Sequence, residues 1–229
     1  IELVAYATNR LSLITKRISL IIDLKKMLAS IIIPTYNRSD VIIRSLETWA
    51  VQTMANTEFE VIVVDNNSTD NSAQLIQDFV ADKPNFHYLL EKQKGSTNAR
   101  HAGAQIAKAD ILIFCDDDGI FNPECVQEVL NVYAANENVD AVAGKIEIQW
   151  DAPAPDWIEP YLFMLGRLNY GKEVIYRHDI YLNGGIFSIR KSVFCELGGF
   201  NPDLVGDYLV GDGDTGLVIK LHKAGKLIG

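Results

Sequence analysis

Short apolar runs that end at polar residues and alternate with helical segments constrain the fold of this chain more than any other feature. The runs occupy residues 31–33, 59–64, 86–90 and 111–115. Helical spacing of apolar residues predicts helices between them, at residues 39–53, 75–80 and 98–109. Strands that alternate with single helices pair in parallel through right-handed crossovers. The sequence therefore predicts an α/β fold, a Rossmann-like three-layer α/β/α sandwich with a mostly parallel central sheet.

Three consecutive carboxylates, Asp116, Asp117 and Asp118, follow directly on the apolar run of residues 111–115. In open α/β sheets, ligands bind at the carboxyl ends of the strands. Adjacent carboxylates repel one another and are costly to bury unpaired, so we expect a cation beside them. Hard oxygen ligands suit Mg²⁺ or Mn²⁺, which complete their shells with substrate phosphates. A solvated acidic turn is the alternative for an isolated triplet.

Two other strand ends carry polar clusters, at residues 35–38 and 65–68. A parallel sheet places all three clusters along one edge. The ring of Tyr36, the acceptors of Asp65 and Asn66, and a metal would together form a pocket for base, ribose and diphosphate. The sequence has no G-x-G-x-x-G and no G-x-x-x-x-G-K-[ST] motif, so metal and side chains must meet the diphosphate charge. Arg100 is placed to help, and a surface arginine is the alternative.

The composition is that of one globular domain with an acidic balance. The 229 residues are 48% hydrophobic and carry a formal net charge of -9. An acidic chain is a poor match for a nucleic-acid backbone, which excludes nucleic acid as the main partner. Three cysteines without a C-x-x-C pair predict reduced thiols in a cytosolic protein. No stretch reaches the ~20 apolar residues that span a bilayer.

Residues 1–28 differ from the rest because they are basic and amphipathic. Their apolar residues fall near helical spacing, which predicts an amphipathic helix. A basic amphipathic helix could lie on an anionic surface, which predicts a cytoplasmic protein with peripheral contact at the inner face of the membrane through residues 1–26. The alternative is upstream sequence that is not native, because the chain lacks a starting Met and Met27 stands just before the first strand. At the other end the chain stops as another strand begins, so we expect a C-terminal truncation.

The second half of the chain predicts a less regular arrangement. We expect a strand at residues 141–150, a helix at 156–168, a strand at 184–190 that leads into a helix at 192–197, and a final helix at 214–224. Asp214 opens the last helix, where a carboxylate commonly acts as an N-cap. On the residues alone, the capping role is favoured over a catalytic one.

Seven short motifs follow one another along the chain: SIIIPTYN (30–37), VVDNNSTD (63–70), NAR (98–100), FCDDD (114–118), NGGIFSIR (183–190), GGF (198–200) and GDTGL (213–217). Together and in this order they resemble a family 2 glycosyltransferase with the GT-A fold. Residues 153–169, with Trp157, also resemble a subgroup of bacterial enzymes that build surface polysaccharides. The resemblance implies a domain at 29–229, with a nucleotide-binding half at 29–118 and an acceptor and catalytic half at 119–229.

The resemblance also implies roles for individual residues. Those expected to hold the nucleotide are Pro34, Thr35, Tyr36, Arg38, Asp65, Asn66, Arg100, Asp116 and Asp117. Asp118 is the expected metal ligand, with Asp116 beside it, and the donor sugar and acceptor would lie against Gly184, Gly185 and Arg190. Asp214 is the expected catalytic base, and Asp212 is the alternative, because Gly213 stands where many family members have Glu. Asn66 stands where Asp is frequent, and its amide oxygen can still accept a hydrogen bond.

The implied function is an inverting, metal-dependent transfer of a sugar from a nucleoside diphosphate to an acceptor hydroxyl, in polysaccharide or glycolipid biosynthesis. The acceptor would be a glycan or a lipid-linked glycan. One alternative is a sugar-1-phosphate nucleotidylyltransferase, although residues 34–37 stand where that class has a glycine-rich loop. The other is a non-catalytic module that binds a nucleotide sugar without turnover.

Overall fold

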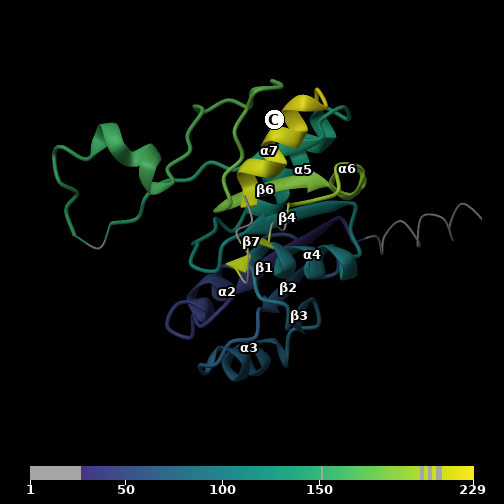
Figure 1. The fold of residues 1–229 in the computed structure, drawn as a ribbon, viewed down its shortest axis with the longest axis vertical. Helices are drawn as coiled ribbons and strands as arrows, with labels where there is room; N and C mark the ends of the chain where they lie inside the picture. The colour runs from purple at the N-terminus through teal and green to yellow at the C-terminus, as the bar shows by residue number, and fades with distance from the viewer. Residues whose placement is uncertain (1–26, 151, 202–203, 206–207, 210–212) are drawn as a thin grey trace, which may run out of the picture.

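The computed structural model describes residues 27–150, 152–201, 204–205, 208–209 and 213–229 (Figure 1). The strands are β1 (Ala29–Thr35), β2 (Phe59–Asp65), β3 (Phe86–Leu90), β4 (Ile111–Cys115), β5 (Ala141–Ala143), β6 (Ile186–Arg190), β7 (Leu204–Val205) and β8 (Tyr208–Leu209). The helices are α2 (Ile42–Ala50), α3 (Ser72–Val80), α4 (Ser96–Ile106), α5 (Cys125–Ala135), α6 (Lys191–Glu196) and α7 (Gly213–Lys223), with a 3₁₀ helix, η1, at Glu159–Leu165. The predicted N-terminal helix and Asp212 lie outside the described residues.

A six-stranded sheet with the order β3-β2-β1-β4-β6-β5 forms the centre of the molecule. β3, β2, β1 and β4 run parallel, because each is connected to the next strand along the chain through a helix. β6 runs antiparallel to both β4 and β5. The mostly parallel α/β sheet predicted from the sequence is confirmed.

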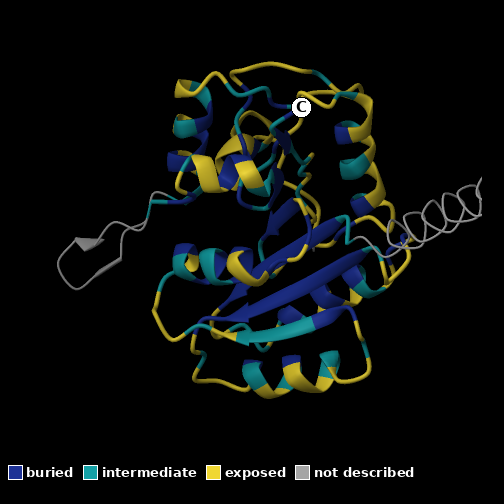
Figure 2. Cartoon of the chain, turned by 90° about the vertical axis from the view of Figure 1, so that its right-hand side faces the viewer, coloured by how far each residue is buried: buried dark blue, intermediate teal, exposed yellow. Residues whose placement is uncertain are grey.

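Helices cover both faces of this sheet. One apolar core packs α2, α3 and α5 against the first face, and a second core packs α4, α6 and α7 against the other. Figure 2 shows the buried strands between helices whose outer sides are exposed. β1 and β2 are buried along their whole length, which accounts for their continuous apolar sequences. This is the predicted three-layer sandwich.

Because β6 runs antiparallel to β4, the residues just before β6 lie at the carboxyl end of β4. Ile186, the first residue of β6, pairs with Cys115, the last residue of β4. Gly184 and Gly185, which precede β6, therefore lie beside the aspartate triplet. Arg190 pairs with Ile111 at the opposite end of β4. Four residues of strand separate the two ends by about 13 Å.

Two predicted elements of the second half differ from the structure. The strand expected at residues 141–150 ends at Ala143, and beyond it only Ile146 forms a bridge, to Leu168. The helix expected at 156–168 is the shorter 3₁₀ helix η1, which stops at Gly166 in a left-handed conformation with φ 94°. The periodic spacing of apolar residues continues through both segments. A longer strand would need a neighbouring strand, and a longer helix would need a layer that covers its apolar face.

Among the described residues, no helix has the length and apolarity needed to cross a membrane.

Close contact between α4 and the sheet depends on Gly103. A β-carbon at this position would lie 2.5 Å from Cγ2 of Ile32 and 3.1 Å from Cγ2 of Val64. Because Ile32 and Val64 are fully buried, neither side chain has free space to move into. We expect Gly103→Val to lower the free energy of unfolding by about 3 kcal/mol, measured by urea denaturation.

The matched control is Gln105→Val on the exposed side of the same helix. It carries the helix-propensity cost of valine alone, about 0.5 kcal/mol. Equal losses in the two variants would contradict the close packing of α4 on the sheet.

Candidate active site

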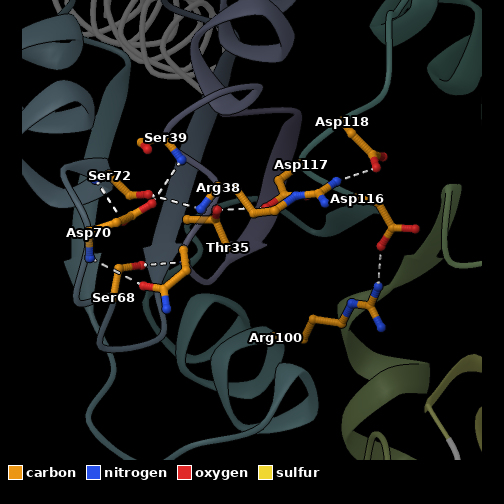
Figure 3. Close-up of polar contacts among 11 residues, drawn as sticks. Thr35, Arg38, Ser39, Ser68, Asp70, Ser72, Arg100, Asp116, Asp117 and Asp118 are labelled. Atoms are coloured by element: carbon orange, nitrogen blue, oxygen red, sulfur yellow. Dashed lines mark hydrogen bonds and ion pairs between the residues drawn. The ribbon is translucent and has the colours of Figure 1, made fainter.

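The loops that follow β1 and β2 are tied together at the carboxyl edge of the sheet, as the contacts in Figure 3 show. Asn37 (φ 53°) and Asn67 (φ 64°) take left-handed conformations, which asparagine tolerates better than most residues. Oδ1 of Asn37 accepts hydrogen bonds from the backbone N–H groups of Thr69 and Asp70, at 2.7 and 3.3 Å. Hydrogen bonds from Ser72 in turn lower the pKa of Asp70 to about 2. These contacts give this edge of the candidate site a fixed shape.

The three aspartates after β4 have different partners. Oδ2 of Asp117 accepts a hydrogen bond from the Thr35 hydroxyl at 2.6 Å, and its side chain is 13% exposed. Arg38 bridges Asp117 and Asp118. Its Nη2 lies 2.5 Å from Oδ2 of Asp118, and its Nε lies 3.4 Å from Oδ1 of Asp117. Asp117 therefore fastens β1 to β4, whereas the exposed carboxylate of Asp118 faces outward.

Asp116 is paired with the buried guanidinium of Arg100. Nη2 of Arg100, on α4, donates to Oδ1 of Asp116 at 2.8 Å (Figure 3). Burial raises the pKa of Asp116 against the lowering effect of Arg100, and the charges of Asp118 and Asp214 raise it further. Burial also raises the pKa of Asp117. Two adjacent carboxylates, Asp116 and Asp117, thus lie in a region that disfavours their charge, which is typical of a functional site.

Asp214 reaches the same region from the first turn of α7. Its Oδ2 accepts the backbone N–H of Gly184 at 2.6 Å, and its Oδ1 accepts that of Thr215 at 3.0 Å. A β-carbon at Gly184 would lie 3.2 Å from Nη2 of Arg100, 3.4 Å from Oδ2 of Asp214 and 3.8 Å from Oδ1 of Asp116. The glycine therefore lets a basic and two acidic side chains converge on one peptide.

Two cavities meet at Asp116. The first has a volume of about 280 Å³ and is lined by Pro34, Thr35, Tyr36, Arg38, Asn66, Ser96, Arg100, Asp116 and Asp117. The second has a volume of about 460 Å³, and its lining includes Asp116, Asp118, Lys145, Glu147, Gln149 and Gly185. The aspartates thus stand between a cavity lined largely by the first half of the chain and one lined largely by the second.

Asp65 and Asn66, expected to contact a nucleoside, are largely occupied by the protein itself. Asp65 is 1% exposed, and its oxygens accept the N–H of Ser68 at 2.9 Å and the hydroxyl of Tyr88 at 2.9 Å. Asn66 lines the first cavity, but its oxygen accepts the N–H of Gly95 at 2.7 Å. In this structure Asp65 shapes the loop after β2 and does not line the first cavity.

Arg190 does not join the site, contrary to the expectation that it lies beside the donor sugar. Its Nε donates to the carbonyl of Val139 at 2.7 Å, and its guanidinium lies over the ring of Tyr133, 5.0 Å from the centroid. The physical reason is the antiparallel direction of β6, which brings the start of that strand to the aspartates and carries its end away.

Sequence reasoning did not single out Ser96 or Lys145, which line the two cavities. Ser96 is the first residue of α4, one turn before Arg100, and this spacing could have indicated it. Lys145 precedes the alternating Ile146 and Ile148, and that alternation could have placed it on the polar side of an extended segment.

Asp116 and Asp118 are the described residues that fit a divalent cation. Their carboxylate oxygens are the hard donors that Mg²⁺ and Mn²⁺ prefer. Burial raises the pKa of Asp116 and the charge of Asp118 adds to it, and a cation would offset both effects. No group of three His, Cys, Asp or Glu side chains in the described part of the chain is arranged to hold an ion alone. The remaining ligands would come from substrate phosphates and water, as is usual for Mg²⁺.

Comparison with known proteins identifies the family. Residues 30–198 match the family model described as Glycosyl transferase family 2. The chain belongs to this family. Among curated relatives, validoxylamine A glucosyltransferase from Streptomyces hygroscopicus subsp. jinggangensis is 36% identical over 119 residues, which cover 51% of this chain and 28% of that relative. The chain therefore spans about a quarter of the length of this curated relative.

Two solved structures share the fold. Staphylococcus aureus TarS 1–349 in complex with UDP-GlcNAc has a TM-score of 0.65 and 22% sequence identity, covering 86% of this chain and 53% of that one. The mannosyltransferase PcManGT from Pyrobaculum calidifontis, in complex with GDP-Man and Mn²⁺, has a TM-score of 0.68 and 18% identity, covering 89% and 54%. At these identities the likeness establishes the GT-A fold of the domain.

Proposed function

We propose that this family 2 domain transfers a sugar, with inversion, from a nucleoside diphosphate to an acceptor hydroxyl. The observation that carries the proposal is the convergence of Arg100, Asp116 and Asp214 on the peptide of Gly184, between two cavities. One carboxylate cluster next to a guanidinium suits a diphosphate and its metal. A second carboxylate across the same peptide suits a base that acts on an acceptor.

The nucleoside diphosphate would occupy the cavity of about 280 Å³. Tyr36, whose side chain is exposed at its rim, offers a ring face for the base. Arg100 would contact the diphosphate, since a guanidinium binds phosphate oxygens in a planar fork. Asp118 and Asp116 would hold Mg²⁺ or Mn²⁺, which would neutralise the diphosphate and improve it as a leaving group. The GDP-Man and Mn²⁺ bound by PcManGT support this assignment.

Asp214 would act as the base. The Gly184 N–H and the Thr215 N–H orient its carboxylate at 2.6 and 3.0 Å. During transfer the acceptor oxygen forms a bond to the anomeric carbon as the bond to the diphosphate oxygen breaks, and Asp214 takes the hydroxyl proton. Because attack comes from the face opposite the leaving group, the configuration at that carbon inverts, as in inverting glycosidases that use water.

The acceptor would enter the cavity of about 460 Å³, whose polar lining of Lys145, Glu147 and Gln149 suits a hydroxylated molecule. A glycan or a lipid-linked glycan meets this requirement. Membrane contact through residues 1–26, and with it a location at the inner face of the membrane, stays a prediction. Equal co-sedimentation with anionic vesicles by proteins with and without residues 1–26 would contradict it.

Release of nucleotide from sugar donors tests the proposal. The protein is incubated with UDP-glucose, UDP-GlcNAc, GDP-mannose or dTDP-glucose, each with Mn²⁺ and with EDTA, and released diphosphate is measured by chromatography. We expect release from one nucleotide class, abolished by EDTA, because water can enter the acceptor cavity and replace the acceptor. Absence of release from every donor would contradict the proposal. Pyrophosphate formed from a sugar 1-phosphate and a nucleoside triphosphate would instead indicate a nucleotidylyltransferase.

A further inference from the structure

His101 follows Arg100 on α4 and contacts the turn that begins after α6. Its Nε2 accepts the backbone N–H of Phe200 at 2.9 Å. Because Nε2 accepts, the imidazole is neutral and carries its proton on Nδ1. The ring packs directly on the turn, since a β-carbon at Gly199 would lie 2.6 Å from Nε2. The left-handed Gly199 (φ 63°) therefore makes room for the imidazole.

A residue of α7 holds the same turn. Nζ of Lys220 donates to the carbonyl of Gly199 at 2.7 Å. Burial lowers the pKa of His101, and the positive charge of Lys220 lowers it further, so the ring stays neutral at physiological pH. Two hydrogen bonds thus hold the backbone of residues 199–200: the imidazole of His101 accepts one, and the ammonium group of Lys220 donates the other.

The ring of Phe200 connects this hydrogen-bonded turn to the candidate site. Phe200 is 1% exposed and packs edge-on against Phe114, with ring centroids 5.2 Å apart. The guanidinium carbon of Arg100 lies 5.6 Å from the centroid of the Phe200 ring. Nε of Arg100 is buried and has no hydrogen-bond partner among the described residues. The direction of the guanidinium toward Asp116 therefore depends on that ion pair and on the aromatic ring beneath it.

We propose that His101 is a positioning residue for donor binding: by accepting the Phe200 N–H, it fixes the ring on which Arg100 rests and so aligns Arg100 with Asp116. The inference rests on the proposed function, because the Arg100–Asp116 pair is where the diphosphate would bind. A proton on Nε2 would turn this acceptor into a donor and break the bond. Protonation of the aspartates at acidic pH lowers donor affinity by itself, and protonation of His101 should add to that loss.

The charged groups around the imidazole are few in the described part of the chain. Lys220 faces it from α7, and Arg100 is its neighbour on α4. The rings that contact it from α6 and from the turn, Phe194 and Phe200, carry no charge. An acid-dependent loss that disappears in a His101 variant is therefore attributable to His101 itself.

The test compares His101→Leu, which removes the acceptor, with His101→Gln, whose amide oxygen reaches about as far as Nε2. His178→Gln is the control, because His178 is exposed and contacts the carbonyl of Lys226. Dissociation constants are measured calorimetrically for UDP and GDP with Mn²⁺ at pH 7.5 and at a series of lower pH values at which the protein stays folded. We expect His101→Leu to bind about tenfold more weakly at pH 7.5, and His101→Gln and the control to match the wild type within about twofold. Once the pH falls below the lowered pKa of His101, we expect the wild type to bind more weakly than His101→Gln.

A nuclear magnetic resonance measurement decides the inference without a nucleotide. Nitrogen shifts of His101 should show an unprotonated Nε2, and the Nε–H signal of Arg100 should move in His101→Leu and stay in place in His101→Gln. A proton on Nε2, or unchanged Arg100 signals and affinities in His101→Leu, would overturn the inference. Failure of the wild type to bind UDP or GDP would instead count against the proposed function. If His101→Leu does not fold, the pH comparison with His101→Gln still decides.

Discussion

Replacing Asp214 by Asn should lower the rate of sugar transfer by about 10³-fold, because the variant cannot take the acceptor proton. Its amide oxygen can still accept the N–H of Gly184, which Asp214 holds at 2.6 Å, so the site should keep its shape. We expect donor affinity within about twofold of the wild type, since the base acts on the acceptor. The measurement is the rate of donor turnover together with the dissociation constant of the nucleotide.

Two parallel variants make this result specific. Asp78→Asn, on the exposed side of α3, should turn over at the wild-type rate. Asp212→Asn tests the alternative base, which lies outside the described residues. Full activity in Asp214→Asn with loss in Asp212→Asn would transfer the base role to Asp212. Loss of nucleotide binding in Asp214→Asn would show that this carboxylate serves the donor side.

Replacing Asp118 by Asn should weaken binding of the diphosphate in the presence of Mn²⁺ by about 100-fold and leave binding in EDTA unchanged. The reason is that Asp118 would supply an anionic ligand to the metal and no direct contact to the nucleotide. Stability should change by less than about 1 kcal/mol, because the Asp118 side chain is 56% exposed and surface ion pairs contribute little. Calorimetric titration with Mn²⁺ and in EDTA measures the two affinities, and urea denaturation measures the change in stability.

Asp116→Asn provides the comparison. This variant should also lose metal-dependent binding, and its binding in EDTA should weaken too, because Arg100 loses the negative charge of the partner that it contacts at 2.8 Å. Metal-dependent affinity that survives in Asp118→Asn but not in Asp116→Asn would assign the metal to Asp116 alone.

The first half of the fold could be predicted closely because its signal is local. Residues 59–64 were expected as a strand, and β2 runs from Phe59 to Asp65. A strand buried on both faces has an unbroken apolar sequence, and the polar residue that ends it marks the sheet edge. Parallel pairing then follows from the helices between strands, which is why the three polar clusters could be expected at one edge.

The second half could not be predicted as well, because its structure depends on distant partners. The apolar residues of 156–168 have helical spacing, yet Trp157, Phe163 and Met164 are 67%, 69% and 79% exposed. Periodicity indicates a buried face only where something covers it. The direction of β6 is likewise invisible in its sequence, because alternation is the same in both directions. That direction is what removes Arg190 from the site.

Within the candidate site, the types of residue were predictable but their separate tasks were not. Three consecutive aspartates look equivalent in sequence. The structure turns Asp117 inward to Thr35 and leaves Asp116 and Asp118 on the cavity lined by Lys145. His101 and Phe200 carry no metal or acid–base pattern, and their connection to Arg100 depends on a turn about 100 residues away along the chain. Only packing reveals such contacts.

Metal-dependent binding of a nucleoside diphosphate tests the central claim most directly. Melting temperatures of the wild-type protein are measured with UDP, GDP, dTDP, ADP and CMP, each with Mn²⁺ and with EDTA. A ligand that binds only the folded chain raises the melting temperature as its concentration increases. We predict stabilisation by one diphosphate in Mn²⁺ and its loss in EDTA. No shift with any nucleotide in either condition would contradict the assignment of Arg100, Asp116 and Asp118 to a donor site.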